Sequence, residues 1–194
     1  FSRNTVSTII APGSSFFNTF TIPFSNPFIP TEVRNSICTA QGLTAAQCDA
    51  AAAATGPSDP NYRTFRSQVR RRFVEAGPRL TDFQTTVYQI KVGVRGDLTD
   101  NIGFDLFATY GESENTARSR GQGLRSRLQQ ALLASDPNAC EDPTGGCVPF
   151  NLFGLVGSIT EPMIGFVVGP QTSSTTATEL STVRAVIDGD LGFS

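Results

Sequence analysis

The sequence predicts an all-β fold, specifically an antiparallel segment of a transmembrane β-barrel whose long loops carry short helices. Apolar and polar residues alternate through 86–98, 102–110 and 182–193, a pattern typical of strands with one apolar face. Only Thr99-Asp100-Asn101 joins the first two runs. A connection of about 65 residues, at about 113–177, joins the second run to the third. Short turns at one end and long loops at the other are typical of membrane barrels.

The alternation also sets the expected bounds of the elements. Strands are expected at about 62–76, 83–98, 102–112 and 178–193, with long loops at about 11–61 and 113–177. About fourteen residues at about 3.3 Å each span roughly 46 Å, and a tilt of about 45° reduces this to roughly 33 Å, near the apolar thickness of a bilayer. A soluble β-sandwich would show the same alternation, so the lengths of strands and connections decide for the barrel.

The short turn determines which residues face each other across the central hairpin. The aliphatic residues of both strands are even-numbered, so facing residues must share parity if the apolar sets lie on one face. A three-residue turn at 99–101 meets this condition and places Leu98 opposite Ile102. The same register places Arg95 opposite Asp105, an opposite-charge pair worth about 0.2–1 kcal/mol. We therefore expect an antiparallel hairpin with Arg95 and Asp105 side by side.

The long connections contain signals for short helices and buried aromatic rings. Thr44 can cap a helix that begins at Ala45, and residues 123–134 place leucines on one helical face. Residues 16–30 combine three prolines with several phenylalanines, which predicts irregular backbone over buried rings. Near 150–166, the phenylalanines favour a small core of the loop over an aromatic platform for a ligand.

Composition excludes several classes of function. Of 194 residues, 16% are charged and the net charge is −2, so attraction of a nucleic acid by bulk charge is not expected. The chain has no histidine, so Ser-His-Asp and Cys-His arrangements are impossible within it. No catalytic, cofactor-binding or metal-binding pattern is present, and we expect neither an enzyme nor a cofactor. No apolar run is long enough for a membrane-spanning helix.

The four cysteines fall into two close pairs. Cys38 and Cys48 are ten positions apart, and Cys140 and Cys147 are seven apart. These spacings, without a histidine, fit no familiar zinc pattern. Two short-range disulfides formed in an oxidising compartment are favoured over four buried free thiols.

Four stretches of sequence carry a resemblance to a known family. They are Asn26-Pro27-Phe28-Ile29-Pro30, Arg71-Arg72-Phe73-Val74-Glu75-Ala76-Gly77-Pro78-Arg79, Tyr88 with Gly93-Val94-Arg95-Gly96-Asp97-Leu98, and Cys147-Val148-Pro149-Phe150-Asn151-Leu152-Phe153-Gly154. In order and spacing, the chain resembles the early part of the barrel of TonB-dependent outer-membrane receptors, in the group common in alphaproteobacteria. The resemblance covers most of the chain.

The resemblance implies a fold and a set of partners. The family fold is a 22-stranded barrel with an N-terminal plug, and the chain is expected to be a barrel fragment without the plug. Its location would be the bacterial outer membrane, with the long loops extracellular. Expected partners are the rest of the barrel and its plug, the TonB energy-transducing complex through that plug, lipopolysaccharide and outer-membrane lipid, and an unknown small ligand such as a siderophore or saccharide.

In such a barrel, one face of each strand meets lipid and the other lines the lumen. Tyr88 and Tyr110 are expected on the lipid face near the extracellular interface. The polar residues expected to face the lumen are Gln89, Lys91, Arg95, Asp105, Thr109, Arg184 and Asp188. The alternative function is that of a soluble extracellular β-rich binding module, such as an adhesin or phage-tail domain.

An arginine-rich stretch precedes the central hairpin and has two interpretations. These arginines could bind a phosphate or another anion. Alternatively, they could form the end of a strand that faces water or lipopolysaccharide. The strand end is favoured, because neighbouring arginines on a strand face opposite sides and do not form one basic surface. The residues are Arg63, Arg66, Arg70, Arg71, Arg72 and Arg79.

Overall fold

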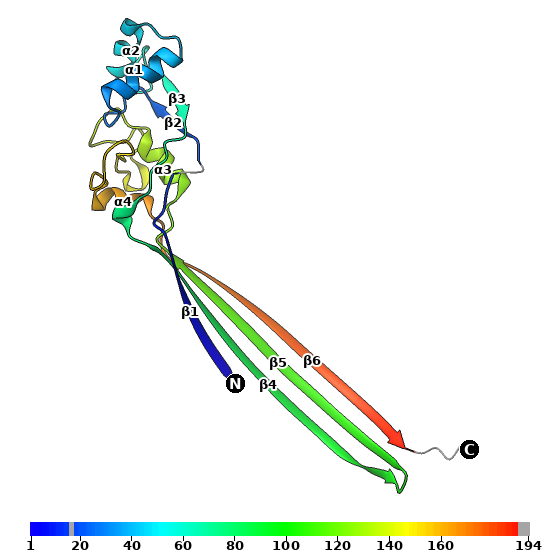
Figure 1. Cartoon of the computed structure of the whole chain (residues 1–194). Helices are drawn as coiled ribbons and strands as arrows, with labels where there is room; N and C mark the ends of the chain where they lie inside the picture. The colour runs from blue at the N-terminus through cyan, green and yellow to red at the C-terminus, as the bar shows by residue number, and fades with distance from the viewer. Residues whose placement is uncertain (16–17, 190–194) are drawn as a thin grey trace. The chain divides into compact units, whose positions relative to one another are not determined.

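The computed structural model describes residues 1–15 and 18–189, which divide into two compact units (Figure 1). The first contains Phe1–Thr8, Thr81–Ser119 and the segment that begins at Thr172. The second contains Ile9–Leu80 and Arg120–Gln171.

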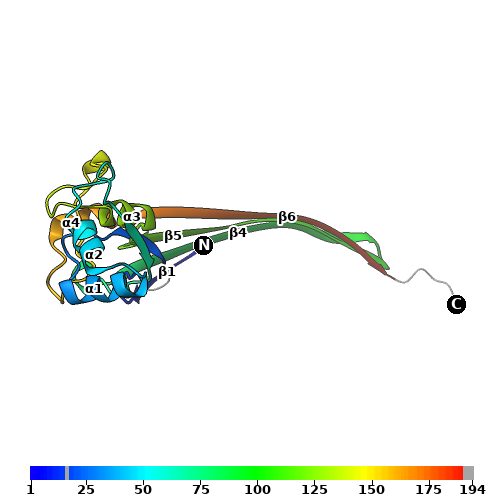
Figure 2. The same cartoon turned by 90° about the horizontal axis from the view of Figure 1, so that it is seen from above.

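The first unit is an open antiparallel sheet of four strands in the order β1-β4-β5-β6. The strands are β1 (Ser2–Ile10), β4 (Arg79–Thr99), β5 (Ile102–Arg120) and β6 (Thr172–Gly189). They lie side by side in both views, and Figure 2 shows them curving along their length. β4, β5 and β6 have 21, 19 and 18 residues, several times the usual five or six.

The strands are longer than the sequence analysis predicts. β4 and β5 extend past the predicted strands 83–98 and 102–112, and β6 begins before the predicted 178–193. The predicted loop 113–177 is therefore wrong at both ends, because Ser113–Ser119 pairs with Thr172–Thr178 throughout. These segments are rich in Ser and Thr and lack apolar alternation, although β-branched Thr favours strands. Residues 190–193 lie outside the described part of the chain.

β1 is a strand that the sequence analysis does not predict. It lies beside β4, where Arg3 donates a hydrogen bond to Gln84 at 2.8 Å and the Ser7 hydroxyl donates to Asp82 at 2.6 Å. All nine of its residues are exposed, so polar cross-strand contacts rather than burial accompany its pairing.

The second unit packs short helices and a small sheet around one apolar core. Its strands are β2 (Phe20–Pro23) and β3 (Thr64–Ser67), its helices are α1 (Thr31–Ala40), α2 (Ala45–Ala52), α3 (Arg125–Leu132) and α4 (Glu161–Val167), and its 3₁₀ turns are η1 (Val74–Ala76) and η2 (Thr144–Gly146). Phe20, Ile22, Phe24, Leu132 and Phe150 are almost completely buried in this core.

The predicted strand 62–76 is wrong over most of its length. β3 ends at Ser67, because its partner β2 has only four residues. Beyond this point the backbone meets a different segment, where Ser15 N–H donates to the Arg71 carbonyl at 3.0 Å and Phe73 N–H donates to the Gly13 carbonyl at 2.8 Å. The chain then turns through η1. The alternation of aromatic residues and arginines therefore reflects one short strand followed by an irregular segment.

Two helices agree with the sequence and two do not. Thr44 caps α2 through a reciprocal capping box with Gln47, as its position predicts. α3 lies inside the predicted range 123–134. α1 and α4 are not predicted. Of the predicted irregular stretch 16–30, residues 18–30 are more regular than predicted, because β2 lies within them, and residues 16–17 lie outside the described part of the chain.

Candidate functional site

The register of β5 and β6 assigns their residues to two faces. Phe104 pairs with Ile187, Leu106 with Ala185, and Ala108 with Val183. Partners directly across a sheet point to the same face. Even residues of β5 therefore share a face with odd residues of β6, which places the aliphatic residues of both strands together.

The contacts between β4 and β5 follow the register predicted from the sequence. Arg95 forms an ion pair with Asp105, with Nη2 3.2 Å from Oδ2, so the predicted side-by-side placement is confirmed. A second contact has the same register: Asn115 Nδ2 donates to Thr85 Oγ1 at 3.1 Å. In both pairs the two residue numbers sum to 200, as they must along one antiparallel ladder without a bulge. Even residues of β4 therefore share the apolar face with even residues of β5.

This shared surface is called the aliphatic face and is exposed to an unusual degree. Val92 is 62% exposed, Val183 75% and Ile187 70%. Further exposed members are Ile90, Val94, Leu98 and Leu106. Isolated soluble domains rarely carry a continuous exposed apolar surface of this extent.

The aliphatic face ends at a pair of tyrosines. The rings of Tyr88 and Tyr110 lie 6.0 Å apart, and both hydroxyls donate to Glu112, at 2.7 and 3.4 Å. Beyond Glu112, the strands remain paired but carry mainly Ser, Thr, Asn and Glu. From Tyr88 to Leu98 the apolar band covers eleven residues of β4, about 36 Å at about 3.3 Å per residue.

The opposite surface is called the polar face, and the register assigns to it all seven polar residues predicted to share one. They are Gln89, Lys91, Arg95, Asp105, Thr109, Arg184 and Asp188. Phe107 also lies on this face, where the Lys91 Nζ sits 3.8 Å from its ring centroid. The polar face is therefore mixed in charge and includes an aromatic ring.

Two glycines of β4 lie opposite aromatic residues of β5, one on each face of the hairpin. A Cβ at Gly93 would lie 2.9 Å from the Leu106 carbonyl oxygen and 2.9 Å from the Phe107 Cβ. A Cβ at Gly96 would lie 2.9 Å from the edge of the Phe104 ring. Aromatic residues across from glycine cover the bare backbone and help to hold the register.

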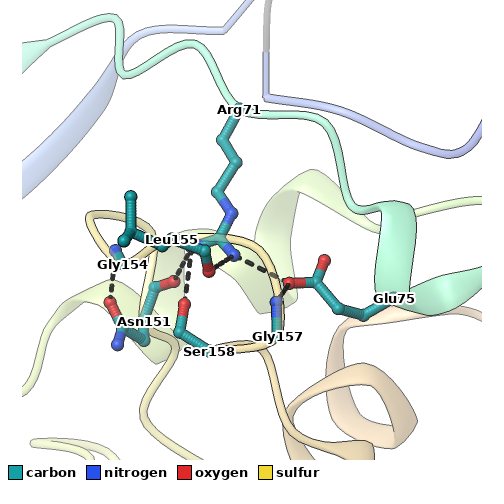
Figure 3. A network of polar contacts seen from close by, with 7 residues as sticks. All are labelled: Arg71, Glu75, Asn151, Gly154, Leu155, Gly157 and Ser158. Atoms are coloured by element: carbon teal, nitrogen blue, oxygen red, sulfur yellow. Dashed lines mark hydrogen bonds and ion pairs between the residues drawn. The ribbon is translucent and has the colours of Figure 1, made fainter.

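The second unit contains a polar network centred on Arg71 (Figure 3). Its guanidinium donates to the carbonyls of Asn151 and Leu155 at 2.9 and 2.7 Å, to the Ser158 hydroxyl at 2.9 Å, and to Glu75 at 2.8 Å. The side chains of Arg71 and Glu75 are only 11% and 12% exposed. Arg71 therefore joins the η1 region to the loop 151–158, which lies about 80 residues away in sequence.

Glu75 remains charged in this network. Burial alone would raise the pKa of its carboxyl group, but backbone N–H donors, including that of Gly157 at 2.8 Å, and the charge of Arg71 outweigh burial. The net effect lowers the pKa. The loop 151–158 is thus held to the η1 region by a charged, hydrogen-bonded network.

The network corrects the interpretation of the arginine-rich stretch as solvated. Arg71 is largely buried and Arg79 donates to the Ala11 carbonyl at 2.8 Å, whereas Arg63, Arg66 and Arg70 are exposed. No pattern in the sequence predicted the Arg71 network. A usable signal was the spacing of four between Arg71 and Glu75.

Both predicted disulfides are present in the second unit. Cys38–Cys48 joins α1 to α2, and Cys140–Cys147 closes a short loop after α3. Phe150 and Phe166 are buried in the apolar core and Phe153 packs against it, which confirms their predicted role in a small core. Tyr62 donates to Glu141 at 2.8 Å, and burial together with this carboxylate raises the pKa of Tyr62.

Within residues 1–15 and 18–189, no helix has the length and apolar character needed to span a membrane. The same residues contain no group of three or more acidic, Cys or His side chains arranged to hold a metal ion. No family model, curated protein or solved structure matches the chain.

Proposed function

We propose that this chain is part of the barrel of an outer-membrane TonB-dependent receptor that imports a scarce ligand, such as a siderophore or saccharide, into the periplasm. The observation that carries the proposal is the aliphatic face. It lies on long paired strands, and its apolar band ends at Tyr88 and Tyr110. Membrane barrels have such a band, about 25 Å tall and flanked by aromatic residues.

The dimensions of the band support this proposal. The eleven residues from Tyr88 to Leu98 span about 36 Å, and a strand tilt of about 45° reduces their height to about 26 Å. The strands themselves are longer, and their Ser- and Thr-rich ends would extend beyond the lipid. In this arrangement the aliphatic face meets lipid and the polar face, including Arg95, lines the lumen.

The resemblance supplies the remaining parts of the proposal. The free edges of β1 and β6 would pair with the rest of the barrel, and the plug would connect the receptor to the TonB complex. The second unit, fastened by its disulfides and by Arg71, would form extracellular loops near lipopolysaccharide. Its oxidised cysteines agree with an oxidising compartment.

The proposal can be tested with spin labels on neighbouring positions of β4. Val92→Cys places a label on the aliphatic face, and Gln89→Cys is the matched control on the polar face. In protein reconstituted into bilayers, we expect the first label to collide mainly with oxygen, which concentrates in lipid, and the second with a water-soluble nickel chelate. Equal nickel accessibility at both positions, in protein that stays monodisperse without detergent, would favour the soluble binding module.

A further inference from the structure

A groove in the second unit lies between α1 and β3. Its volume is about 440 Å³, within the range of about 300–1,000 Å³ that is usual for ligand pockets. Apolar residues of α1, at the spacing of one helical face, line one side, and consecutive residues of β3 line the other. They are Val33, Ile37 and Ala40 on α1, and Phe65, Arg66 and Ser67 on β3. Phe65 and Arg66 point to opposite faces of the sheet, so a groove that both residues line runs along the edge of β3.

This edge of β3 carries backbone groups without partners. Thr21 of β2 is the residue directly opposite Arg66. The Gln129 side-chain amide accepts from the Thr21 N–H at 2.9 Å and donates to the Thr21 carbonyl at 2.7 Å, so both groups of Thr21 point away from β3. Because opposed residues of an antiparallel pair exchange either both hydrogen bonds or neither, the N–H and carbonyl of Arg66 point away from β2. In the described part of the chain, no other group bonds to them.

Arg66 also places a positive charge beside this edge. Its side chain is exposed and, among the residues that the structure describes, it forms neither an ion pair nor a side-chain hydrogen bond. Of the described residues that line the groove, Arg66 is the only charged one. An open strand edge is a template for a further strand. Here that edge lies between a cation and the apolar wall of α1, which favours an extended partner that is both acidic and apolar.

We propose that the groove binds an extended, acidic segment of another polypeptide, which adds to β3 as a new strand. The residue of this segment opposite Arg66 exchanges both backbone hydrogen bonds with it. A Glu at that position shares the face of the Arg66 guanidinium, whereas apolar neighbours of the Glu point to the face of Phe65, beside the apolar wall of α1. The groove lies wholly within the second unit, so this proposal does not depend on the proposed function.

The test uses a fluorescein-labelled peptide of sequence Thr-Val-Glu-Val-Thr with a blocked carboxyl terminus. Its binding to the full chain in zwitterionic micelles is followed by fluorescence anisotropy. One control peptide carries a methyl group on the backbone nitrogen of Glu, which removes the N–H that would bond to the Arg66 carbonyl. A second control peptide has Gln in place of Glu, which removes the charge and keeps the backbone.

We expect saturable binding of the first peptide and about tenfold weaker binding of the methylated peptide, the value for a lost hydrogen bond whose partner stays unsatisfied. The Gln peptide should bind up to about fivefold more weakly, the value for an opposite-charge pair across strands. Arg66→Gln should abolish the difference between the Glu and Gln peptides. Arg66→Pro should weaken binding about tenfold, because it removes the edge N–H and no bond to β2.

Binding that does not saturate would overturn the proposal, and so would equal binding of the methylated peptide, a comparison that does not depend on the folding of any variant. Hydrogen exchange in Phe20–Pro23 shows whether Arg66→Pro keeps the pairing of β2 with β3. A preference for Glu that persists in Arg66→Gln would show that Arg66 does not select the acidic residue. A dimer of the peptide-free chain in density-matched sedimentation, dissociated by Arg66→Pro, would show that a second copy occupies the edge instead.

Discussion

Replacing Arg71 with alanine should release the loop 151–158. The substitution removes the partner of Glu75, a carboxylate that is 12% exposed, together with the donors to the carbonyls of Asn151 and Leu155. Removing one member of a buried ion pair costs about 3–5 kcal/mol, because the other charge stays buried without compensation. The lower value corresponds to a change of roughly a hundredfold in the local opening equilibrium.

Hydrogen exchange measured by mass spectrometry gives the local stability of this loop. Gly157 N–H donates to Glu75 and Gly154 N–H donates to Asn151 Oδ1, both at 2.8 Å. In Arg71→Ala, we expect peptides that cover 151–158 to exchange roughly a hundredfold faster, while peptides from β5 and β6 keep their rates. Arg70→Ala is the matched control, because Arg70 is exposed and its side chain donates a hydrogen bond to the nearby Gln68 at 3.4 Å, with no such bond to the loop among the described residues. Equal exchange of the loop in both variants would refute the assignment of Arg71 as its fastening.

Three further predictions concern charge, the apolar band and the hairpin. The pKa of Glu75 is lower in the folded protein than in the unfolded chain, so its stabilising contribution is complete above the unfolded value and is lost as the pH falls through the folded value. Protection factors in 151–158, which correct the exchange rates for the pH dependence of intrinsic amide exchange, should therefore fall through this titration, and protection factors that do not change with pH would contradict this. Val92→Arg should cost about 2–4 kcal/mol of folding stability in bilayers, measured by urea titration, while Gln89→Arg on the polar face should be mild. Gly93→Ala should destabilise the hairpin by about 1–3 kcal/mol, because the new Cβ would lie 2.9 Å from a backbone carbonyl oxygen. Gly111→Ala is the control and should be well tolerated, because the nearest atom to its new Cβ would be 3.5 Å away. Similar urea midpoints for the two variants would contradict this prediction and show that the backbone at Gly93 shifts to make room.

Local patterns predicted the hairpin and one helix start correctly, because each depends on residues close in sequence. The parity of the aliphatic residues required the register that brings Arg95 beside Asp105. Thr44 and Gln47 form a capping box within a single turn of helix. The cysteine pairs are also local, with separations of ten and seven positions.

The Arg71 network could not be predicted in the same way. Its partners Asn151 and Ser158 are 80 and 87 positions away, and nothing in their own sequence marks them as acceptors for an arginine. The spacing of Arg71 and Glu75 suggests an ion pair, but it does not show that the pair is buried. Burial arises from the fold of the whole unit, so this part of the site needs the structure.

The strand ends show what apolar alternation measures. The predicted ends at 112 and 178 lie where the aliphatic residues stop, next to Glu112, yet the ladder continues to Ser119 opposite Thr172. Backbone hydrogen bonds need no apolar side chains, whereas alternation records which environment each face meets. In the proposed barrel, that change of environment is the boundary of the lipid, and the tyrosines lie at that boundary. Strands that leave a membrane and remain paired in water are therefore expected to be longer than their apolar alternation. In a uniformly solvated sheet, there is no reason for the aliphatic face to stop part-way along the strands.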